Sequence, residues 1–215
     1  MVRWPSLAGI DFTAVLIQFA ALVVSLSVHE AAHAWTADRL GDPTARMLGR
    51  VTLNPAAHVD PIGTILFPLL AMLTRVPLIG WAKPVPVAVR NLRGNWRQQY
   101  MLIAAAGPLS NIALALGAAA IYRVIFGSPF ENVGLAAQLV ILFVQLNVLL
   151  ALFNLVPVPP LDGGNVLAGL LTGSAADSFD RIRPYGFLII YGLMLTGVLW
   201  SVIGPIQETL ISVLL

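Results

Sequence analysis

Long apolar runs separated by short polar stretches dominate this chain of 215 residues. A membrane-spanning helix needs about 20 predominantly apolar residues. Three runs reach that length without a break, and they cover Phe12–Arg39, Gln99–Phe126 and Asn132–Val156. A fourth covers Pro184–Ile203 and continues toward the C-terminus past a Gly-Pro pair. The pattern predicts an all-α polytopic membrane protein with about four full transmembrane helices.

A further apolar run, Ile62–Ile79, differs because Gly63, Pro68, Arg75 and Pro77 interrupt it. Proline and glycine disfavour a continuous helix, and irregular backbone at membrane depth is tolerated only where protein buries it or where it lines a cavity. We expect this run to enter the membrane and return on the same side as a re-entrant segment.

A small β element near the active site is expected on either side of this run. Residues 45–53, ARMLGRVTL, alternate loosely, as a short strand with a bulge at Gly49 would. Residues 80–89, GWAKPVPVAV, should be extended, because each proline pushes the preceding residue toward β or polyproline geometry. Ala45–Leu53 and Lys83–Val89 are therefore two candidate edges for an extended substrate, and plain connecting structure is the alternative.

Composition supports the membrane assignment. Hydrophobic residues make up 58% of the chain and charged residues 10%, whereas soluble domains carry roughly 25% charge. The length fits one membrane-embedded domain over residues 1–215, surrounded by the lipid bilayer. The net charge of +2 comes without a basic patch interleaved with aromatic residues, so we expect no nucleic-acid partner. Because cysteine is absent, a metal site must use histidine and carboxylate ligands.

The chemistry is concentrated near the end of the first run, where His29, Glu30 and His33 form an H-E-x-x-H motif. On a helix the two histidines lie on one face, one turn apart, and can bind one zinc ion. The glutamate between them can act as general base on a zinc-bound water. Titratable groups are costly at membrane depth, so those that occur there are usually functional. The alternative, a helix end solvated by water, agrees less well with this spacing and depth.

Asp162 is the candidate third ligand, since a catalytic zinc site usually has three protein ligands and one open position. It follows the Asn132–Val156 run in a stretch that prolines keep from being helical. Gly163 and Gly164 then allow a sharp turn or a close backbone approach. The local sequence is equally compatible with a capping aspartate at the membrane surface.

Two motifs occur in a distinctive order: HEAAH in an early membrane helix, and NLVPVPPLDGG at Asn154–Gly164 after a later one. Together they resemble the site-2 protease family of intramembrane zinc metalloproteases. The resemblance extends to NPAAHVDPIG at 54–63, GWAKPVPV at 80–87 and AGPLSN at 106–111, so it covers roughly residues 20–170. The chain looks most like the compact prokaryotic members, because no PDZ-like or CBS-like insertion interrupts it.

The resemblance implies one Zn²⁺ per chain, with His29, His33 and Asp162 as ligands and Glu30 as the catalytic base. It also implies hydrolysis of peptide bonds in membrane-spanning or membrane-associated protein substrates, within the prokaryotic inner (plasma) membrane. Two alternatives are a membrane zinc hydrolase of a non-protein substrate and a catalytically inactive scaffold of the same fold. A transporter is disfavoured, because its ionisable residues would be spread over several spans.

Four other polar residues each allow more than one interpretation: Asn154, His58, Asn111 and Arg75. Asn154 matches the asparagine of the family motif, and it either orients substrate, stabilises the oxyanion or forms an interhelical hydrogen bond. His58 is expected at the surface or behind the metal ligands, since a fourth protein ligand would close the site. Asn111 is expected to pack helices, and Arg75 to reach the membrane surface or mark a break.

Membrane topology follows from where the ligands must meet. The C-terminal ends of the first and third runs must reach the same membrane face to bring His33 and Asp162 together. Residues 40–98 must then leave and return on that face, as a re-entrant segment allows. Most arginines and lysines fall on this face, which the positive-inside rule makes the cytoplasm. We therefore expect an outside N-terminus and a zinc site nearer the cytoplasmic face.

Overall fold

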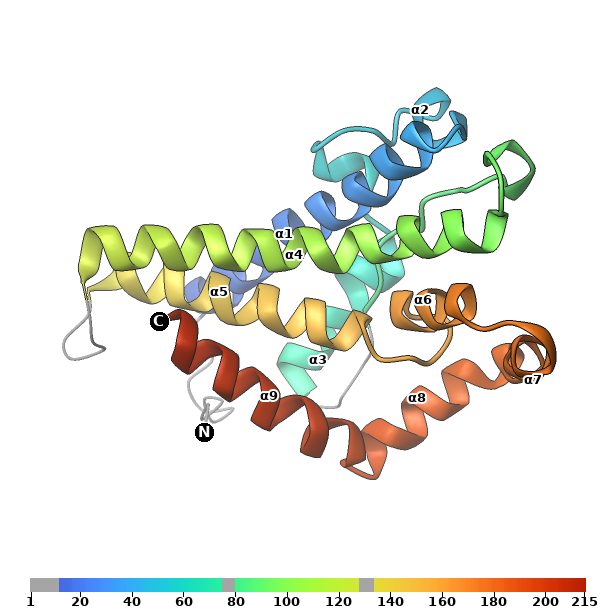
Figure 1. The fold of residues 1–215 in the computed structure, drawn as a ribbon. Coiled ribbons are helices and arrows are strands. Elements are labelled where there is room, and N and C mark those ends of the chain that lie inside the picture. The colour runs from blue at the N-terminus through green and yellow to red at the C-terminus, as the bar shows by residue number, and fades with distance from the viewer. Residues whose placement is uncertain (1–11, 75–79, 128–133) are drawn as a thin grey trace.

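The structure is a computed structural model that describes residues 12–74, 80–127 and 134–215. In these residues every regular element is a helix, which confirms the predicted all-α class (Figure 1). The longer α-helices are α1 (Phe12–Arg39), α4 (Trp96–Phe126), α5 (Leu135–Asn154) and α9 (Val198–Leu214). The shorter ones are α2 (Thr44–Met47), α3 (Phe67–Thr74), α6 (Asp162–Leu170), α7 (Gly173–Ile182) and α8 (Gly186–Leu195).

Three of these helices, α1, α4 and α5, are long and apolar enough to cross a membrane. Their bounds lie within three residues of the predicted runs. The fourth predicted span is instead a bent pair, in which the Gly173–Leu195 segment and α9 meet at 71°. The bend falls at Gly197, whose φ of 75° is a left-handed conformation that ends a helix. The Gly204–Pro205 pair lies inside α9, so the helix continues past it as the sequence analysis expected.

The membrane-spanning helices form the body of the molecule. Figure 1 shows α4 and α5 side by side, with α1 crossing them obliquely. Small residues line the contact of α4 with its neighbours. Ala37 of α1 packs with Ile103 of α4, and Ala115 and Ala119 of α4 pack with Ala137 of α5. Such residues let helices approach closely where lipid offers no hydrophobic drive.

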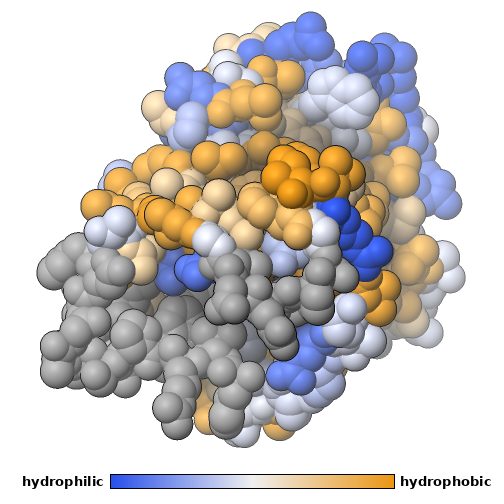
Figure 2. Space-filling model, turned by 90° about the vertical axis from the view of Figure 1, so that its left-hand side faces the viewer, coloured by the Kyte–Doolittle hydropathy of each residue, from blue (hydrophilic) through white to orange (hydrophobic). Residues whose placement is uncertain are grey.

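Large apolar side chains are exposed on the outer faces of these helices. Leu16 of α1, Leu116 of α4 and Leu135 of α5 are 67%, 51% and 67% exposed. Figure 2 shows hydrophobic residues in a broad area across the middle of the face that it draws, with strongly hydrophilic ones mainly along its upper and right-hand edges. An exposed apolar belt of this kind is what contact with lipid requires.

Residues 40–95 leave the helical bundle and return to it at the same end of α1. The backbone N–H of Arg93 donates to the carbonyl of Leu40 at 3.2 Å. The N–H of Ala88 donates to Oδ2 of Asp42 at 2.6 Å. The chain that joins α1 to α4 therefore begins and ends at one end of the bundle, as the topology argument requires.

The apolar segment inside this excursion starts and finishes at neighbouring positions, and its re-entry into a membrane stays a prediction. It begins with a turn of π-helix at Pro61–Leu66 and continues into α3, and its apolar helix is shorter than a membrane span. The N–H of Trp81 donates to the carbonyl of Gly63 at 3.0 Å, so the chain comes back beside its point of entry. Arg75, for which two roles were considered, lies outside the described residues.

The predicted β element is wrong for the described residues, which contain no strand. Residues 45–53 begin inside α2, whose first residue, Thr44, donates its N–H and its hydroxyl to the side chain of Asp42. Gly49 has a φ of 68° and ends this turn, where a β-bulge was expected. Residues 80–88 lie outside regular secondary structure, as their prolines predict, and no strand lies beside them.

Arg50 and Asp42 hold residues 80–88 in place. Arg50 is 5% exposed, and its guanidinium donates to the carbonyls of Lys83 and Pro84. Asp42 is fully buried and accepts the N–H of Ala88. Both side chains come from the stretch between α1 and the re-entrant segment, so they tie two parts of the excursion together.

Asp42 is suited to this role because it is ionised near neutral pH. Burial alone would raise the pKa of its carboxyl. Hydrogen bonds from Thr44, Asn91 and the N–H of Ala88 outweigh burial and hold the pKa of Asp42 below its ordinary value. The carboxylate then acts as an acceptor for all of these donors at once.

Candidate metal centre

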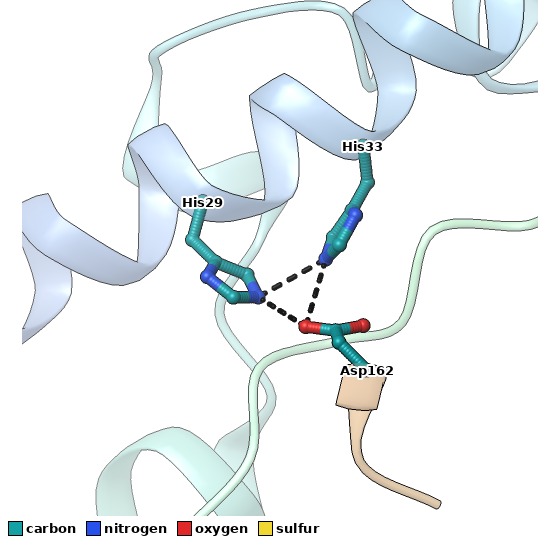
Figure 3. Close-up of side chains that lie close together, drawn as sticks. All are labelled: His29, His33 and Asp162. Carbon is teal, nitrogen blue, oxygen red and sulfur yellow. Dashed lines mark hydrogen bonds and ion pairs between the residues drawn. The ribbon is translucent and has the colours of Figure 1, made fainter. Parts of the chain in front are cut away.

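His29 and His33 project from one face of α1 toward Asp162, as their spacing predicts (Figure 3). Their Nε2 atoms are 3.0 Å apart. Oδ2 of Asp162 lies 3.0 Å from Nε2 of His29 and 3.4 Å from Nε2 of His33. Ligand atoms held at about 2.0–2.2 Å from a tetrahedral zinc lie roughly 3.3–3.6 Å from one another. Only the longest separation lies in this range and the other two fall just below it, but the three atoms surround one point that a metal ion could occupy.

The far side of each imidazole decides which nitrogen is available to a metal. Nδ1 of His29 lies 2.6 Å from Oδ1 of Asn111, and Nδ1 of His33 lies 2.7 Å from the carbonyl oxygen of Ile103. A carbonyl oxygen can only accept, so Nδ1 carries the proton in both rings. In each neutral ring Nε2 is then the nitrogen with a lone pair, and both Nε2 atoms point to the same place, as histidines that bind metal require.

Asp162 reaches this point because the chain turns sharply after α5. The carboxylate is in the first turn of α6, directly after the proline-rich loop. A Cβ on Gly163 would lie 2.3 Å from the carbonyl oxygen of Leu155, and one on Gly164 would lie 2.6 Å from the nitrogen of Pro159. Only glycine fits at both positions, which lets the loop fold back against the end of α5.

Gly107 of α4 faces the two imidazoles. A Cβ at this position would lie 2.4 Å from Nε2 of His33 and 2.5 Å from Nε2 of His29. The absence of a side chain leaves room where the three ligand atoms converge. Together with the two Nδ1 hydrogen bonds and the N₂O donor set, this space shows that the residues fit a zinc ion.

A cavity of about 460 Å³ opens beside the three ligands, and His29, His33 and Asp162 all line it. Glu30 lines the same cavity and is 9% exposed. The remaining walls come mainly from residues 80–87, from the ends of α4 and α5 and from α8. The site can therefore bring a carboxylate base, a metal and a bound chain segment together.

Asn154 also lines the cavity, from the last turn of α5. Its Nδ2 donates to the carbonyl of Leu150 at 2.9 Å, within the same helix. This bond orients the amide, and it is not the interhelical hydrogen bond that was one of the interpretations of the sequence.

His58 lies away from the metal ligands and does not line the cavity. It is 2% exposed, and its Nε2 lies 2.8 Å from the carbonyl oxygen of Thr52. Its own carbonyl accepts the N–H of Lys83 at 2.8 Å. His58 thus connects the loop before the re-entrant segment to residues 80–88.

Two residues near the ligands have roles that the sequence interpretation missed. Gly107 was not singled out as a site residue, and Asn111 was expected only to pack helices. The signals were present: Gly107 precedes a proline in the middle of a span, and Asn111 is a polar residue within it. Neither signal says which histidine lies opposite, because that depends on how α1 and α4 cross.

Comparisons with known proteins place the chain among metalloproteases. The model of peptidase family M50 matches residues 123–196. "Putative zinc metalloprotease YwhC" of Bacillus subtilis (strain 168) is 35% identical over 201 residues, which cover 89% of this chain and 87% of that protein.

Mycobacterial proteins are similar as well. "Putative zinc metalloprotease Rip2" of Mycolicibacterium smegmatis is 30% identical over 86% of this chain and 68% of that protein. The protein of the same name in Mycobacterium tuberculosis (strain H37Rv) is 33% identical over 82% of this chain and 66% of that protein. No solved structure gives a significant match.

The geometry at Gly107 predicts the effect of adding one methyl group. Gly107→Ala should lower the zinc content of purified protein from about one ion per chain, because its Cβ would occupy the space beside both Nε2 atoms. Metal analysis of the purified full chain measures this, with His29→Ala and Asp162→Ala as reference variants of low zinc content.

Gly117→Ala is the matched control, because this position is on the same helix and a Cβ there meets nothing within 4 Å. Alanine stabilises a helix relative to glycine by roughly 0.5–1 kcal/mol, so loss of α4 would not explain a loss of zinc. Full zinc content in Gly107→Ala would contradict the proposed place of the metal.

Proposed function

This chain belongs to peptidase family M50, the site-2 proteases, and from that premise we propose that its zinc is held by His29, His33 and Asp162 for intramembrane proteolysis. One observation carries the proposal. The Nε2 atoms of two imidazoles and one carboxylate oxygen converge on the wall of a cavity, next to the glutamate of the same motif. A purely structural ion pair would need neither the glutamate nor the cavity.

When bound, zinc lowers the pKa of a coordinated water toward ~7 and polarises the carbonyl that is to be cleaved. Glu30 accepts the proton of the attacking water at its carboxylate and returns it to the leaving amine. Its position between the two histidines, on the wall of the same cavity, supports this role. Asn154 orients the substrate through the amide atoms that its bond to Leu150 leaves available.

The substrate binds in an extended conformation beside residues 80–88. Among the described residues, no partner occupies the backbone N–H and C=O groups of Ala82, Val85 and Val87, and all three residues line the cavity. Arg50 and Asp42 hold this segment in place through other backbone groups, the carbonyl of Lys83 and the N–H of Ala88. An extended chain laid alongside would satisfy these groups as an added strand does.

This arrangement favours a polypeptide over a non-protein substrate, the second candidate. A lipid offers no regular series of backbone donors and acceptors to match residues 82–87. The inactive-scaffold alternative is not favoured, since the metal ligands and Glu30 share one cavity. We therefore assign membrane-spanning or membrane-associated proteins as the substrate class.

The membrane in question is the bacterial plasma membrane, and the zinc site lies nearer its cytoplasmic face. The named relatives are bacterial. Arg97 and Arg183 both pair with Asp180, which places the basic residues around α7 at the same end as the start of α4. Arg123, at the other end of α4, donates to carbonyls at the end of α9. The end of the bundle where α1 ends and α4 begins is here called the metal-centre end. Its excess of positive charge favours the cytoplasm for that end.

Glu30→Gln should retain zinc and fold but lose cleavage. The amide keeps the shape of the side chain but cannot accept the proton, and general bases of this kind contribute typically 10²–10⁴-fold in rate. Cleavage of a co-expressed single-span membrane protein, followed by gel, measures the loss.

Glu208→Gln is the control for this experiment, because Glu208 is exposed on α9 and should be dispensable. Near-normal turnover by Glu30→Gln would sink the general-base role. Incubating the purified protein with peptide and lipid substrates, with and without a chelator, separates the protease from the non-protein hydrolase.

Val85→Pro tests the substrate edge. Val85 already lies between two prolines, so the change removes one backbone N–H and little else. Loss of one hydrogen bond should raise KM about threefold to tenfold, with kcat and zinc content unchanged. Val85→Ala, which keeps the N–H, should bind substrate more nearly like the wild type. Equal effects of the two variants would argue against backbone pairing here.

Single cysteines can test the topology, because the chain has none of its own. Leu48→Cys, Val89→Cys and Ser174→Cys should all react with an impermeant thiol reagent from the cytoplasm, since these exposed residues lie at the metal-centre end. Gly134→Cys, at the start of α5, should react only from outside. Reaction of Val89→Cys only from outside would overturn the re-entrant arrangement in the membrane.

A further inference from the structure

A chain of buried polar side chains leads away from His29 and joins all three membrane-spanning helices. Its other members are Asn111 of α4, Asn147 of α5 and Ser25 of α1, and all three are fully buried. Nδ1 of His29 lies 2.6 Å from Oδ1 of Asn111, and Nδ2 of Asn111 donates to Oδ1 of Asn147 at 2.9 Å. Nδ2 of Asn147 donates to Oγ of Ser25 at 3.0 Å. Polar groups at this depth are costly unless every one is paired.

One backbone carbonyl sets the direction of every bond in this chain. Nδ2 of Asn147 lies 2.9 Å from the carbonyl oxygen of Phe143, which can only accept. Asn147 must therefore turn its NH₂ group there, which points its Oδ1 at Asn111. Asn111 must then donate from its own NH₂ group to that Oδ1, which points the Oδ1 of Asn111 at His29. His29 must then carry its proton on Nδ1, and its Nε2 is free for the metal.

His29 needs this chain of bonds to fix which of its nitrogens carries the proton, whereas His33 does not. His33 bonds to the backbone carbonyl of Ile103, which offers only an acceptor. Asn111 is a side-chain amide, and either of its ends could face His29. A reversed Asn111 would present NH₂ to His29 and favour the tautomer whose Nε2 is protonated, which binds no metal. The same reversal would set Oδ1 of Asn111 against Oδ1 of Asn147, which leaves two buried acceptors facing each other.

We propose that Asn147 is a positioning residue of the metal centre, acting through Asn111 to hold His29 in its metal-binding tautomer and orientation. Asn147 does not line the cavity and touches no ligand of the metal. The proposal rests on the proposed role of His29 as a zinc ligand. A residue on α5 thereby controls a ligand on α1 across α4.

The test is the zinc dissociation constant of the purified full chain, measured by competition with a chelator in detergent. Asn147→Leu should bind zinc about 10- to 100-fold more weakly, the usual cost of losing a group that orients a metal ligand. Asn147→Thr should shift the constant in the same direction. Its hydroxyl can still bond to the Phe143 carbonyl within α5 but is too short to reach Asn111, so this variant keeps the test open if the leucine variant does not fold.

Ser27→Ala is the matched control, because Ser27 is as buried as the residues of the chain but bonds only to the Val23 carbonyl of its own helix. Its zinc affinity should equal that of the wild type. The double variant Asn111→Leu/Asn147→Leu should bind zinc no more weakly than Asn111→Leu alone, because both changes break one chain of bonds.

Thermal unfolding of the metal-free variants separates positioning from general stability. A merely structural role would lower the melting temperature of Asn147→Thr and leave its zinc dissociation constant unchanged, and that result would overturn the proposal. If His29→Ala itself bound zinc normally, the ligand assignment would fail instead, which distinguishes the two hypotheses.

Discussion

The close approach of α4 to α1 at Gly107 is the constraint on which the metal centre depends. Because Gly107 has no side chain, α4 can lie directly against the face of α1 that carries His29 and His33. That distance lets the Ile103 carbonyl and the Asn111 amide each reach one imidazole. A larger residue would push the helices apart, so both Nδ1 partners would be lost together with the space beside the Nε2 atoms.

Asp162 meets the two histidines through a second close contact, between the loop that precedes it and the end of α5. The loop before Asp162 folds against the end of α5 because Gly163 and Gly164 leave no Cβ in the way. The carboxylate is then carried on the first turn of α6, whereas both histidines are carried on α1. Three elements far apart in the sequence must therefore be packed before the site exists. In such a case metal binding and helix packing stabilise one another.

The sequence was sufficient for the three long helices and for the shared face of His29 and His33, because both follow from local rules, whereas the local sequence left Asp162 open. Span length follows from bilayer thickness, and the position of His29 and His33 follows from the helical repeat. The β element was wrong because alternation says nothing about a partner strand, and the short helix α2 forms there instead. The pairing of Asn111 with Asn147 could not be read from spacing, since it depends on which faces of α4 and α5 meet.

The bend between α8 and α9 completes the site rather than interrupting a span by accident. A Cβ on Gly186 would lie 1.9 Å from the carbonyl oxygen of Pro159, so α8 starts in direct contact with the loop that carries Asp162. Phe187 and Ile190 of α8 then line the cavity. The bend of 71° lets α9 turn away and pack on α5. A straight helix could not cover the cavity and pack along α5 at once, and Gly197, with its left-handed backbone, makes both contacts compatible.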